Sequence, residues 1–240
     1  MTPTILSFDT SGPHCCVSLF SDGDVAASRY EAMSRGQSEN LFALIQATLN
    51  DVGAVFEELD AIAVGIGPGN FTGVRISVSA ARGLSMSLGI PAIGVTNFEA
   101  LAHICPAPLD QDWLISLPSP RRDRDVMVQY FTQGFPSGNP MELVVWENTK
   151  GTNSEDFAGF PGEPYVYGHE ANALDFILSN DRGGAYPFEF SASLRQSHAI
   201  GQVAAKKLEC QAEFPAPSPL YIRPADAAPP KDPAPLILDK

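Results

Sequence analysis

The chain has 240 residues, with 28 acidic and 15 basic side chains and a formal net charge of −13 at pH 7. With 44% hydrophobic and 18% charged residues it can build a folded core, which excludes an intrinsically disordered chain. The negative charge disfavours direct binding of duplex or tRNA phosphates, because such binding normally needs a basic patch. The local basic cluster Arg121, Arg122 and Arg124 is interpreted as a solvated loop between two strands.

No apolar run approaches the roughly 20 residues that span a bilayer, and no basic stretch precedes an apolar one at the N-terminus. We therefore expect a cytoplasmic protein that does not enter a membrane. Cys15, Cys16, Cys105 and Cys210 show no CxxC spacing, and the first two should point to opposite faces of a strand. This pattern favours reduced thiols over disulfides or a zinc site.

The first hundred residues predict alternating strands and helices. We expect strands at 4–8, 14–20, 25–27, 60–65 and 92–95, and helices at 38–52, 74–88 and 96–104. Three antiparallel strands followed by strand–helix units are typical of a mixed five-stranded sheet with helices on both faces. This is the layout of the ribonuclease-H-like half-domain found in actin-like ATPases.

The second half predicts a shorter, looser copy of the same unit. Strands are expected at 113–117, 125–131, 143–146 and 165–167, helices at 170–179 and 198–210, and proline-rich loops at 136–164. Eight of the 21 prolines lie between Pro215 and Pro235, which indicates an extended tail. The predicted fold is α/β, with two mixed-sheet half-domains. Its expected boundaries are 1–102, 103–214 for a reduced second domain, and 215–240 for the tail.

Two turns have residues that suit phosphate binding. Asp9, Thr10 and Ser11 follow the first strand, where amides and a hydroxyl can hold a phosphate. A second loop joins a strand to a helix N-terminus, a place that suits anions, although it lacks the lysine of a Walker loop. Its candidate residues are Gly67, Gly69, Thr72 and Gly73. The alternative interpretation is that both segments are tight structural turns whose side chains satisfy their own amides.

The helices expected at 38–52 and 74–88 suggest an association surface. The first has a broad apolar face and the second has small residues on several faces, which allows close helix approach. We expect Phe42 and Ile45 to enter the core and Leu41 and Leu44 to stay exposed. The predicted partner interface comprises Leu41, Leu44, Ile45, Val74, Ser77, Val78, Ala81 and Ser85.

Several motifs resemble the TsaB family, whose members act in threonylcarbamoyladenosine (t6A) modification of tRNA. The resemblance is dense over residues 4–102 and most specific in the run Gly67-Pro68-Gly69-Asn70-Phe71-Thr72-Gly73-Val74-Arg75. It returns weakly at 219–224. The resemblance implies an actin-like fold and a paralogue of the catalytic subunit TsaD that has lost the active site.

The same resemblance implies a protein with no catalytic residues and no metal of its own. TsaD needs an HxxxH pair for its metal, whereas the four histidines here are at least 29 residues apart. The implied partners are TsaD, the ATPase TsaE in a larger complex, and a second copy when the chain is alone, with tRNA contacted only indirectly. No cofactor is expected. Weak ATP or ADP binding stays compatible with the Gly67–Gly73 loop, which would be a vestige of a nucleotide site.

Two other functions remain open on the sequence alone. A small-molecule kinase of the actin-like superfamily would use Asp9, Thr10 and the Gly67–Gly73 loop to hold ATP, with Gly183-Gly184 as its second phosphate loop. A glycoprotease, a label that relatives of the family have carried, is disfavoured because the metal pair is missing. Neither a GxSxG elbow nor an HExxH helix is present.

Overall fold

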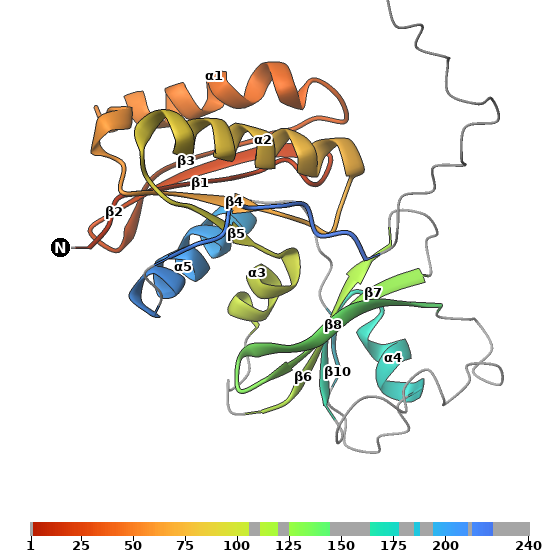
Figure 1. Ribbon diagram of the computed structural model, residues 1–240. Helices are drawn as coiled ribbons and strands as arrows, with labels where there is room; N and C mark the ends of the chain where they lie inside the picture. Colours follow the sequence, from red (N-terminus) through yellow and green to blue (C-terminus); the bar gives the residue numbers. More distant parts are fainter. Residues whose placement is uncertain are drawn as a thin grey trace, which may run out of the picture.

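The computed structural model describes residues 2–105, 111–119, 125–144, 164–177, 185–187, 194–210 and 213–222. These residues form two five-stranded sheets with helices packed on their faces (Figure 1). Arg121, Arg122, Arg124, the Gly183-Gly184 pair and the tail beyond Ile222 lie outside the described residues. None of the helices in the described part is long and apolar enough to cross a bilayer.

The first sheet contains the five strands expected in the first hundred residues. They are β1 (Ile5–Asp9), β2 (His14–Ser21), β3 (Asp24–Ala32), β4 (Ala61–Gly65) and β5 (Ala92–Val95), in the order β3-β2-β1-β4-β5. The first three are antiparallel neighbours, whereas β4 pairs parallel to β1 and β5 parallel to β4. Strand β3 is several residues longer than predicted because it pairs along the whole length of β2.

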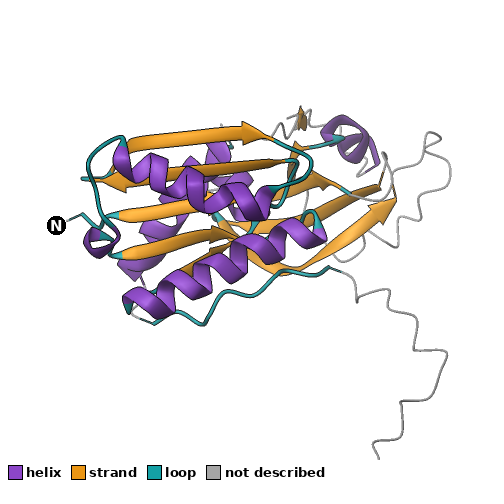
Figure 2. Cartoon of the chain, turned by 90° about the horizontal axis from the view of Figure 1, so that it is seen from above, coloured by secondary structure: helices purple, strands orange, loops and turns teal. Residues whose placement is uncertain are grey.

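Helices cover both faces of this sheet. On one face α1 (Gln37–Asn50) and α2 (Phe71–Leu88) lie side by side, and on the other lie α3 (Asn97–Ile104) and α5 (Leu194–Cys210) (Figures 1 and 2). A 3₁₀ turn (Phe56–Glu58) precedes β4. Helix α3 starts at the predicted cap, where Thr96 and Glu99 form a capping box.

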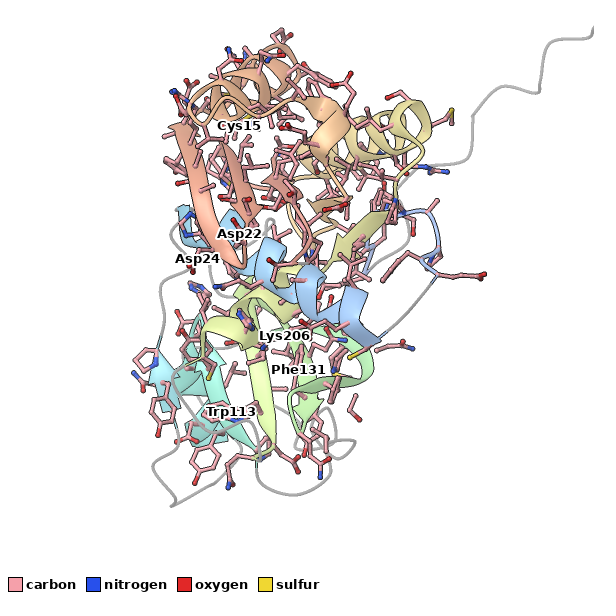
Figure 3. The ribbon with its side chains drawn as sticks, turned by 90° about the vertical axis from the view of Figure 1, so that its left-hand side faces the viewer. Cys15, Asp22, Asp24, Trp113, Phe131 and Lys206 are labelled. Carbon is pink, nitrogen blue, oxygen red and sulfur yellow. The ribbon has the colours of Figure 1, made fainter. Side chains whose placement is uncertain are left out.

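The alternation of side chains along the strands divides the core between the two faces. Leu6 and Phe8 pack toward α1 and α2, while Ile5 and Phe20 pack toward α5. Cys15 lies in the first of these clusters (Figure 3), which agrees with the period-2 geometry of a strand.

The second sheet repeats the topology of the first. Its strands are β6 (Trp113–Pro118), β7 (Asp125–Thr132), β8 (Phe135–Val144), β9 (Tyr165–Gly168) and β10 (Ala185–Pro187), in the order β10-β9-β6-β7-β8. The pairs β6–β7 and β7–β8 are antiparallel, and β6–β9 and β9–β10 are parallel, as in the first sheet. The predicted actin-like arrangement of two mixed-sheet halves is therefore confirmed.

Helices also flank the second sheet. Trp113 and Phe131, labelled in Figure 3, pack against Phe98 and Leu101 of α3. On the opposite face lies α4 (Ala171–Ile177), whose Leu174 is fully buried. Helix α3 thus contacts α5 of the first half and β6 of the second, and joins the two halves through a continuous core.

The expectation of proline-rich loops over 136–164 is wrong for its first nine residues. Residues 135–144 form β8, in which Pro136 lies opposite Phe131 and Leu143 opposite Val126. Proline is tolerated here because β8 is the outermost strand, so one side of its backbone needs no hydrogen-bond partner.

The expected second domain, residues 103–214, includes a last helix that in the structure belongs to the first half. Helix α5 contacts β1, β2, β4 and β5 of the first sheet. The following segment, 213–222, runs beside α2, where the Leu220 N–H donates to the Ile66 carbonyl (Figure 2). The apolar face of α5 fits either sheet by pattern alone, so the sequence could not place it.

A glycine-to-alanine substitution tests the packing of α5 on the first sheet. A Cβ on Gly201 would overlap the Phe20 ring, so Gly201→Ala should destabilise the protein by about 1–3 kcal/mol. Gly83→Ala is the matched control, because Gly83 also lies inside a helix but has nothing within 4 Å of its Cβ position.

Calorimetry should show a lower melting temperature for Gly201→Ala, and an equal or higher one for Gly83→Ala, which gains helix propensity. Equal stabilisation by both substitutions would contradict this packing of α5.

Candidate functional site

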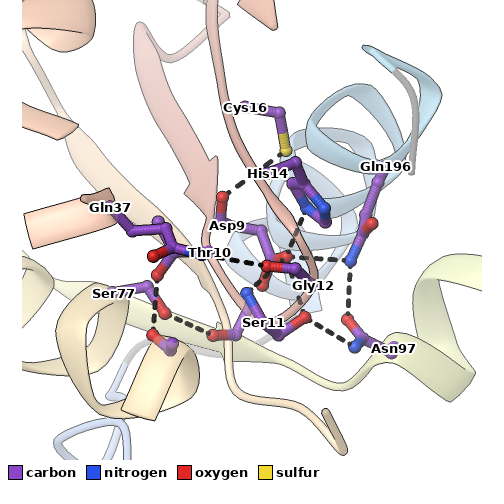
Figure 4. Close-up of polar contacts among 12 residues, drawn as sticks. Asp9, Thr10, Ser11, Gly12, His14, Cys16, Gln37, Ser77, Asn97 and Gln196 are labelled. Atoms are coloured by element: carbon purple, nitrogen blue, oxygen red, sulfur yellow. Dashed lines mark hydrogen bonds and ion pairs between the residues drawn. The ribbon is translucent and has the colours of Figure 1, made fainter. Parts of the chain in front are cut away.

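The turn after β1 holds a carboxylate that is fully buried. The Asp9 side chain is 0% exposed, and its Oδ2 accepts four hydrogen bonds (Figure 4). The donors are the Ser11 amide and hydroxyl, His14 Nε2 on β2 and Gln196 Nε2 on α5, at 2.8–3.0 Å. Because a buried carboxylate without donors is strongly unfavourable, this cluster fixes β1, β2 and α5 to one another.

The hydrogen-bond network continues from Asp9 to the start of α3. Asn97 Nδ2 donates to the Ser11 hydroxyl at 2.9 Å and to the Pro68 carbonyl at 2.7 Å. Asn97 Oδ1 in turn accepts from Gln196 Nε2 at 3.0 Å. One buried network therefore connects the β1 turn, the glycine loop, α3 and α5.

The glycine loop is closed by the protein's own groups. Asn70 Oδ1 accepts hydrogen bonds from the Thr72 and Gly73 amides at 3.0 and 2.9 Å and caps α2, which therefore starts three residues earlier than predicted. The backbone N–H of Asn70 donates to the Ser11 carbonyl at 2.6 Å. The Thr72 and Gly73 amides, which could hold an anion at the helix N-terminus, are thus already engaged.

Two glycines of this loop allow its backbone to touch the β1 turn. A Cβ on Gly69 would overlap the Ser11 carbonyl, and one on Gly73 would overlap the Thr10 carbonyl. The Thr10 hydroxyl also donates to the Gly73 carbonyl at 2.6 Å. The structure thus brings the predicted residues of both turns together, but against one another. Of the two interpretations left open by the sequence, this contact favours tight structural turns.

The same cluster contains three groups of metal-ligand type. Ligand atoms of Asp9, His14 and Cys16 all lie within 4.8 Å of one another. His14 Nε2 and Asp9 Oδ2 are engaged with each other, whereas the buried Asp9 Oδ1 and His14 Nδ1 atoms have no hydrogen-bond partner among the described residues. Burial also raises the pKa of the Cys16 thiol well above its usual value, which disfavours the thiolate that binds metals.

A cleft of about 1010 Å³ opens between the two halves of the molecule, beside the β1 turn. Its walls include His14, Gln37 and Asn97 from the first half and Leu117 and Met127 from the second. The described lining has no Lys, Arg, Asp or Glu side chain, and the β6–β7 turn at 120–124 lies outside the described residues. This part of the cleft offers hydrogen bonds and apolar contact without a cation for phosphates.

The predicted interface residues on α1 and α2 point into the core. Leu41 is 1% and Leu44 5% exposed, whereas Phe42 is 50% exposed, so the expected order of exposure is reversed. Ile45 is buried as expected. On α2, Val74, Ser77, Val78 and Ala81 are buried and Ser85 is half-buried. Most of these eight side chains are therefore unavailable to a partner in the monomer.

The accessible surface of these helices is instead a groove between them. It has a volume of about 770 Å³ and is called here the α1–α2 groove. Its lining comprises Ser38, Leu41, Phe42, Thr72, Arg75, Ile76, Ser79, Ala80, Gly83, Leu84 and Ser87. Phe42 stands exposed at its edge, and Met86 on α2 is 85% exposed.

Sequence reasoning missed several residues of the site. His14, Asn97 and Gln196 are not among the site residues predicted from the sequence. The contact of His14 with Asp9 could have been predicted, because the two residues are five positions apart across a tight turn. No local pattern links Gln196 to Asp9, because 187 positions separate them.

Comparisons with known proteins agree with this architecture. A family model described as TsaD, tRNA N6-adenosine threonylcarbamoyltransferase, matches residues 30–132. The tRNA threonylcarbamoyladenosine biosynthesis protein TsaB of Escherichia coli is 37% identical over 99 residues, 41% of this chain and 42% of that protein. TsaB of Bacillus subtilis is 35% identical over 99 residues, 41% of this chain and 43% of that protein. The match thus spans less than half the length of these curated relatives.

Solved structures extend the similarity in fold to nearly the whole chain. YeaZ from Pseudomonas aeruginosa superposes with a TM-score of 0.67 at 21% identity, covering 91% of this chain and 99% of that one. An uncharacterised P. aeruginosa protein similar to peptidase YeaZ gives the same TM-score at 24% identity, covering 92% and 100%. At these identities the structures establish the fold alone.

Replacing the cap of α2 tests whether the glycine loop is held by its own contacts. Asn70→Ala removes the acceptor for two amides and should destabilise the protein by about 1 kcal/mol. Asn70→Asp is the matched control, since it keeps an acceptor oxygen at the cap. Thermal unfolding of both variants is the measurement.

The same experiment is repeated with ATP and magnesium. Because the loop amides are engaged, the nucleotide should leave the melting temperature of the unsubstituted chain unchanged. A large ATP-dependent rise that Asp9→Asn removes would contradict the account and indicate a working nucleotide site.

Proposed function

We propose that this chain, which is similar to TsaB proteins over 99 residues, is a non-catalytic partner subunit. In this role it supports TsaD in N6-threonylcarbamoyladenosine modification of adenosine 37 in tRNA. The observation that carries the proposal is the uncovered α1–α2 groove, combined with a fold whose phosphate-binding turns are occupied by the protein itself.

The groove has the properties of a helix-docking surface. Small residues line it on α2, including Ser79, Ala80 and Gly83, and Phe42 rises at its edge on α1. Small side chains let a facing helix approach to the short end of the roughly 8–10 Å interaxial range. An isologous pair of these helices would form a four-helix bundle, and TsaD, of the same fold, could replace one copy.

The lack of catalysis rests on two features. The chain matches a TsaD-type model over residues 30–132, yet the sequence contains no HxxxH pair, the metal-binding feature that the resemblance implies for TsaD. In addition, Asp9 is fully buried and its Oδ2 is engaged by four protein donors, which disfavours direct contact with a nucleotide-bound magnesium ion.

Further partners follow from the same proposal. TsaE would join the TsaD-bound complex, a homodimer would form when TsaD is absent, and the complex would work in the cytoplasm. The net charge of −13 supports only indirect contact with tRNA. The kinase alternative is not favoured, because the described cleft lining lacks a cation for ATP phosphates and the α2 amides are capped.

A pair of substitutions on the accessible surface tests the interface. Phe42→Glu with Gly83→Arg places two charges in the groove without touching the sheet core, and should reduce TsaD binding and self-association at least tenfold. Ala43→Glu is the control, because Ala43 is exposed on α1 outside the groove lining. Calorimetric titration with TsaD and sedimentation velocity are the measurements.

Salt provides an independent check on self-association. Both protomers carry −13, so screening should strengthen the homodimer.

Unchanged TsaD affinity in the folded Phe42→Glu, Gly83→Arg variant would place the interface elsewhere and overturn the proposal.

A further inference from the structure

An arginine on α2 is held by two aromatic side chains where it lines the α1–α2 groove. The Arg75 guanidinium lies 3.5 Å from the centroid of the Phe71 ring, one helical turn earlier. Arg75 Nε donates a hydrogen bond to the Tyr221 hydroxyl at 2.8 Å, and the two aromatic rings lie 5.6 Å apart. A guanidinium that is stacked on one ring and bonded to another side chain has few orientations left to it.

The position of Tyr221 is itself fixed by the backbone. Tyr221 belongs to the segment 213–222, which runs beside α2 (Figure 2). In this segment the Leu220 N–H donates to the Ile66 carbonyl at 2.8 Å. The orientation of Arg75 therefore depends on a contact between two segments that are 146 positions apart in the sequence.

The terminal nitrogens of Arg75 are not used by the protein itself. Among the described residues, Arg75 forms one hydrogen bond, through Nε, and no ion pair with a carboxylate. The side chain is exposed, and it is the one charged residue in the described lining of the groove. Because a guanidinium carries N–H donors on all three nitrogens, those on the two terminal nitrogens remain available to a partner.

The exposed face of α2 has the opposite charge to the chain as a whole. Its charged side chains are Arg75 and Arg82, both exposed, and no Asp or Glu occurs in this helix. Helix α1 contributes one carboxylate, Glu39, which accepts a hydrogen bond from the Ser38 hydroxyl. On a chain with a net charge of −13, such a face favours an acidic partner. A second copy would offer it only Glu39 from these two helices.

We propose that Arg75 binds a carboxylate of the partner, an Asp or Glu on the TsaD helix that enters the α1–α2 groove. This inference rests on the proposed function and deepens it, because it states which chemical group the partner must present. A guanidinium can pair with a carboxylate through two parallel hydrogen bonds, and one that is already oriented loses little freedom on binding. Phe71 and Tyr221 act as positioning residues for this contact.

Substitution of Arg75 tests the proposal. Arg75→Gln removes the charge and should weaken TsaD binding at least about tenfold, the size expected for an interface arginine of high importance. It should change self-association less than about twofold, because a second copy presents few carboxylates. Arg75→Lys keeps the charge without the planar fork and should restore only part of the lost affinity. Calorimetric titration with TsaD and sedimentation velocity are the measurements.

Arg82→Gln is the matched control. Arg82 is an exposed arginine on the same helix, but it lies outside the groove lining. Its substitution should therefore change TsaD affinity less than about twofold, as expected for a peripheral surface charge. Arg75 and Arg82 are both exposed, so both variants should keep the melting temperature of the unsubstituted chain close to its original value.

Ionic strength separates an ion pair from a packing effect. Because salt screens exposed charges, the roughly tenfold loss caused by Arg75→Gln at about 50 mM salt should shrink to about threefold or less at about 500 mM. Tyr221→Phe keeps the aromatic ring but removes the acceptor of the Arg75 Nε bond. It should cause a loss of about two- to fivefold that depends on salt in the same way, as expected for one hydrogen bond that orients a charge.

The outcomes separate this inference from the proposed function. A loss for Arg75→Gln that is equal at both salt concentrations, or that Arg82→Gln matches, overturns the carboxylate contact. Equal weakening of self-association and TsaD binding overturns the preference for an acidic partner. If Arg75→Gln binds TsaD normally while the Phe42→Glu, Gly83→Arg variant does not, the inference fails and the proposed function stands. Normal TsaD binding by both variants overturns both.

Discussion

The carboxyl group of Asp9 is fully buried at the end of β1, the middle strand of the first sheet. A buried carboxylate must be matched by donors, and here these come from the β1 turn, β2 and α5. Asn97 and Gln196 extend the same requirement to α3 and the glycine loop. The positions of these elements are therefore coupled through one buried carboxyl group.

This coupling has a consequence for function. In a mixed sheet of this topology the carboxyl ends of the central strands are the usual place for a ligand. Here the glycine loop rests on the β1 turn and Asn70 caps the helix that could hold an anion. The polar groups that could bind phosphate stabilise the protein instead, and the α1–α2 groove lies open on the helical face.

The sequence predicted the strands of the first half well because each is a short buried run with clear turns. It predicted the repeated topology of the second half for the same reason, but β8 was hidden by its prolines, which an edge strand tolerates. Contacts such as Gln196 with Asp9 could not be predicted, because polar pairing between distant elements leaves no local period.

Helix α1 shows how a small error in phase changes a functional prediction. The predicted core residues of this helix were Phe42 and Ile45, with Leu41 and Leu44 exposed. The observed buried stripe is Leu41, Leu44, Ile45, Thr48 and Leu49. Thr48 obscured this stripe because it is polar, yet its hydroxyl donates to the Leu44 carbonyl and is satisfied inside the core. Ile45 is buried in both the predicted and the observed stripe, so the shift is smaller than the roughly 100° that separates neighbouring residues, yet it buries Leu41 and exposes Phe42.

Hydrogen–deuterium exchange with and without TsaD tests the central claim most directly. The account predicts slower exchange in peptides covering 38–46 and 72–87, with no change in the edge strand β3. Protection confined to β3 or to the cleft residues near Leu117, with α1 and α2 unaffected, would contradict it.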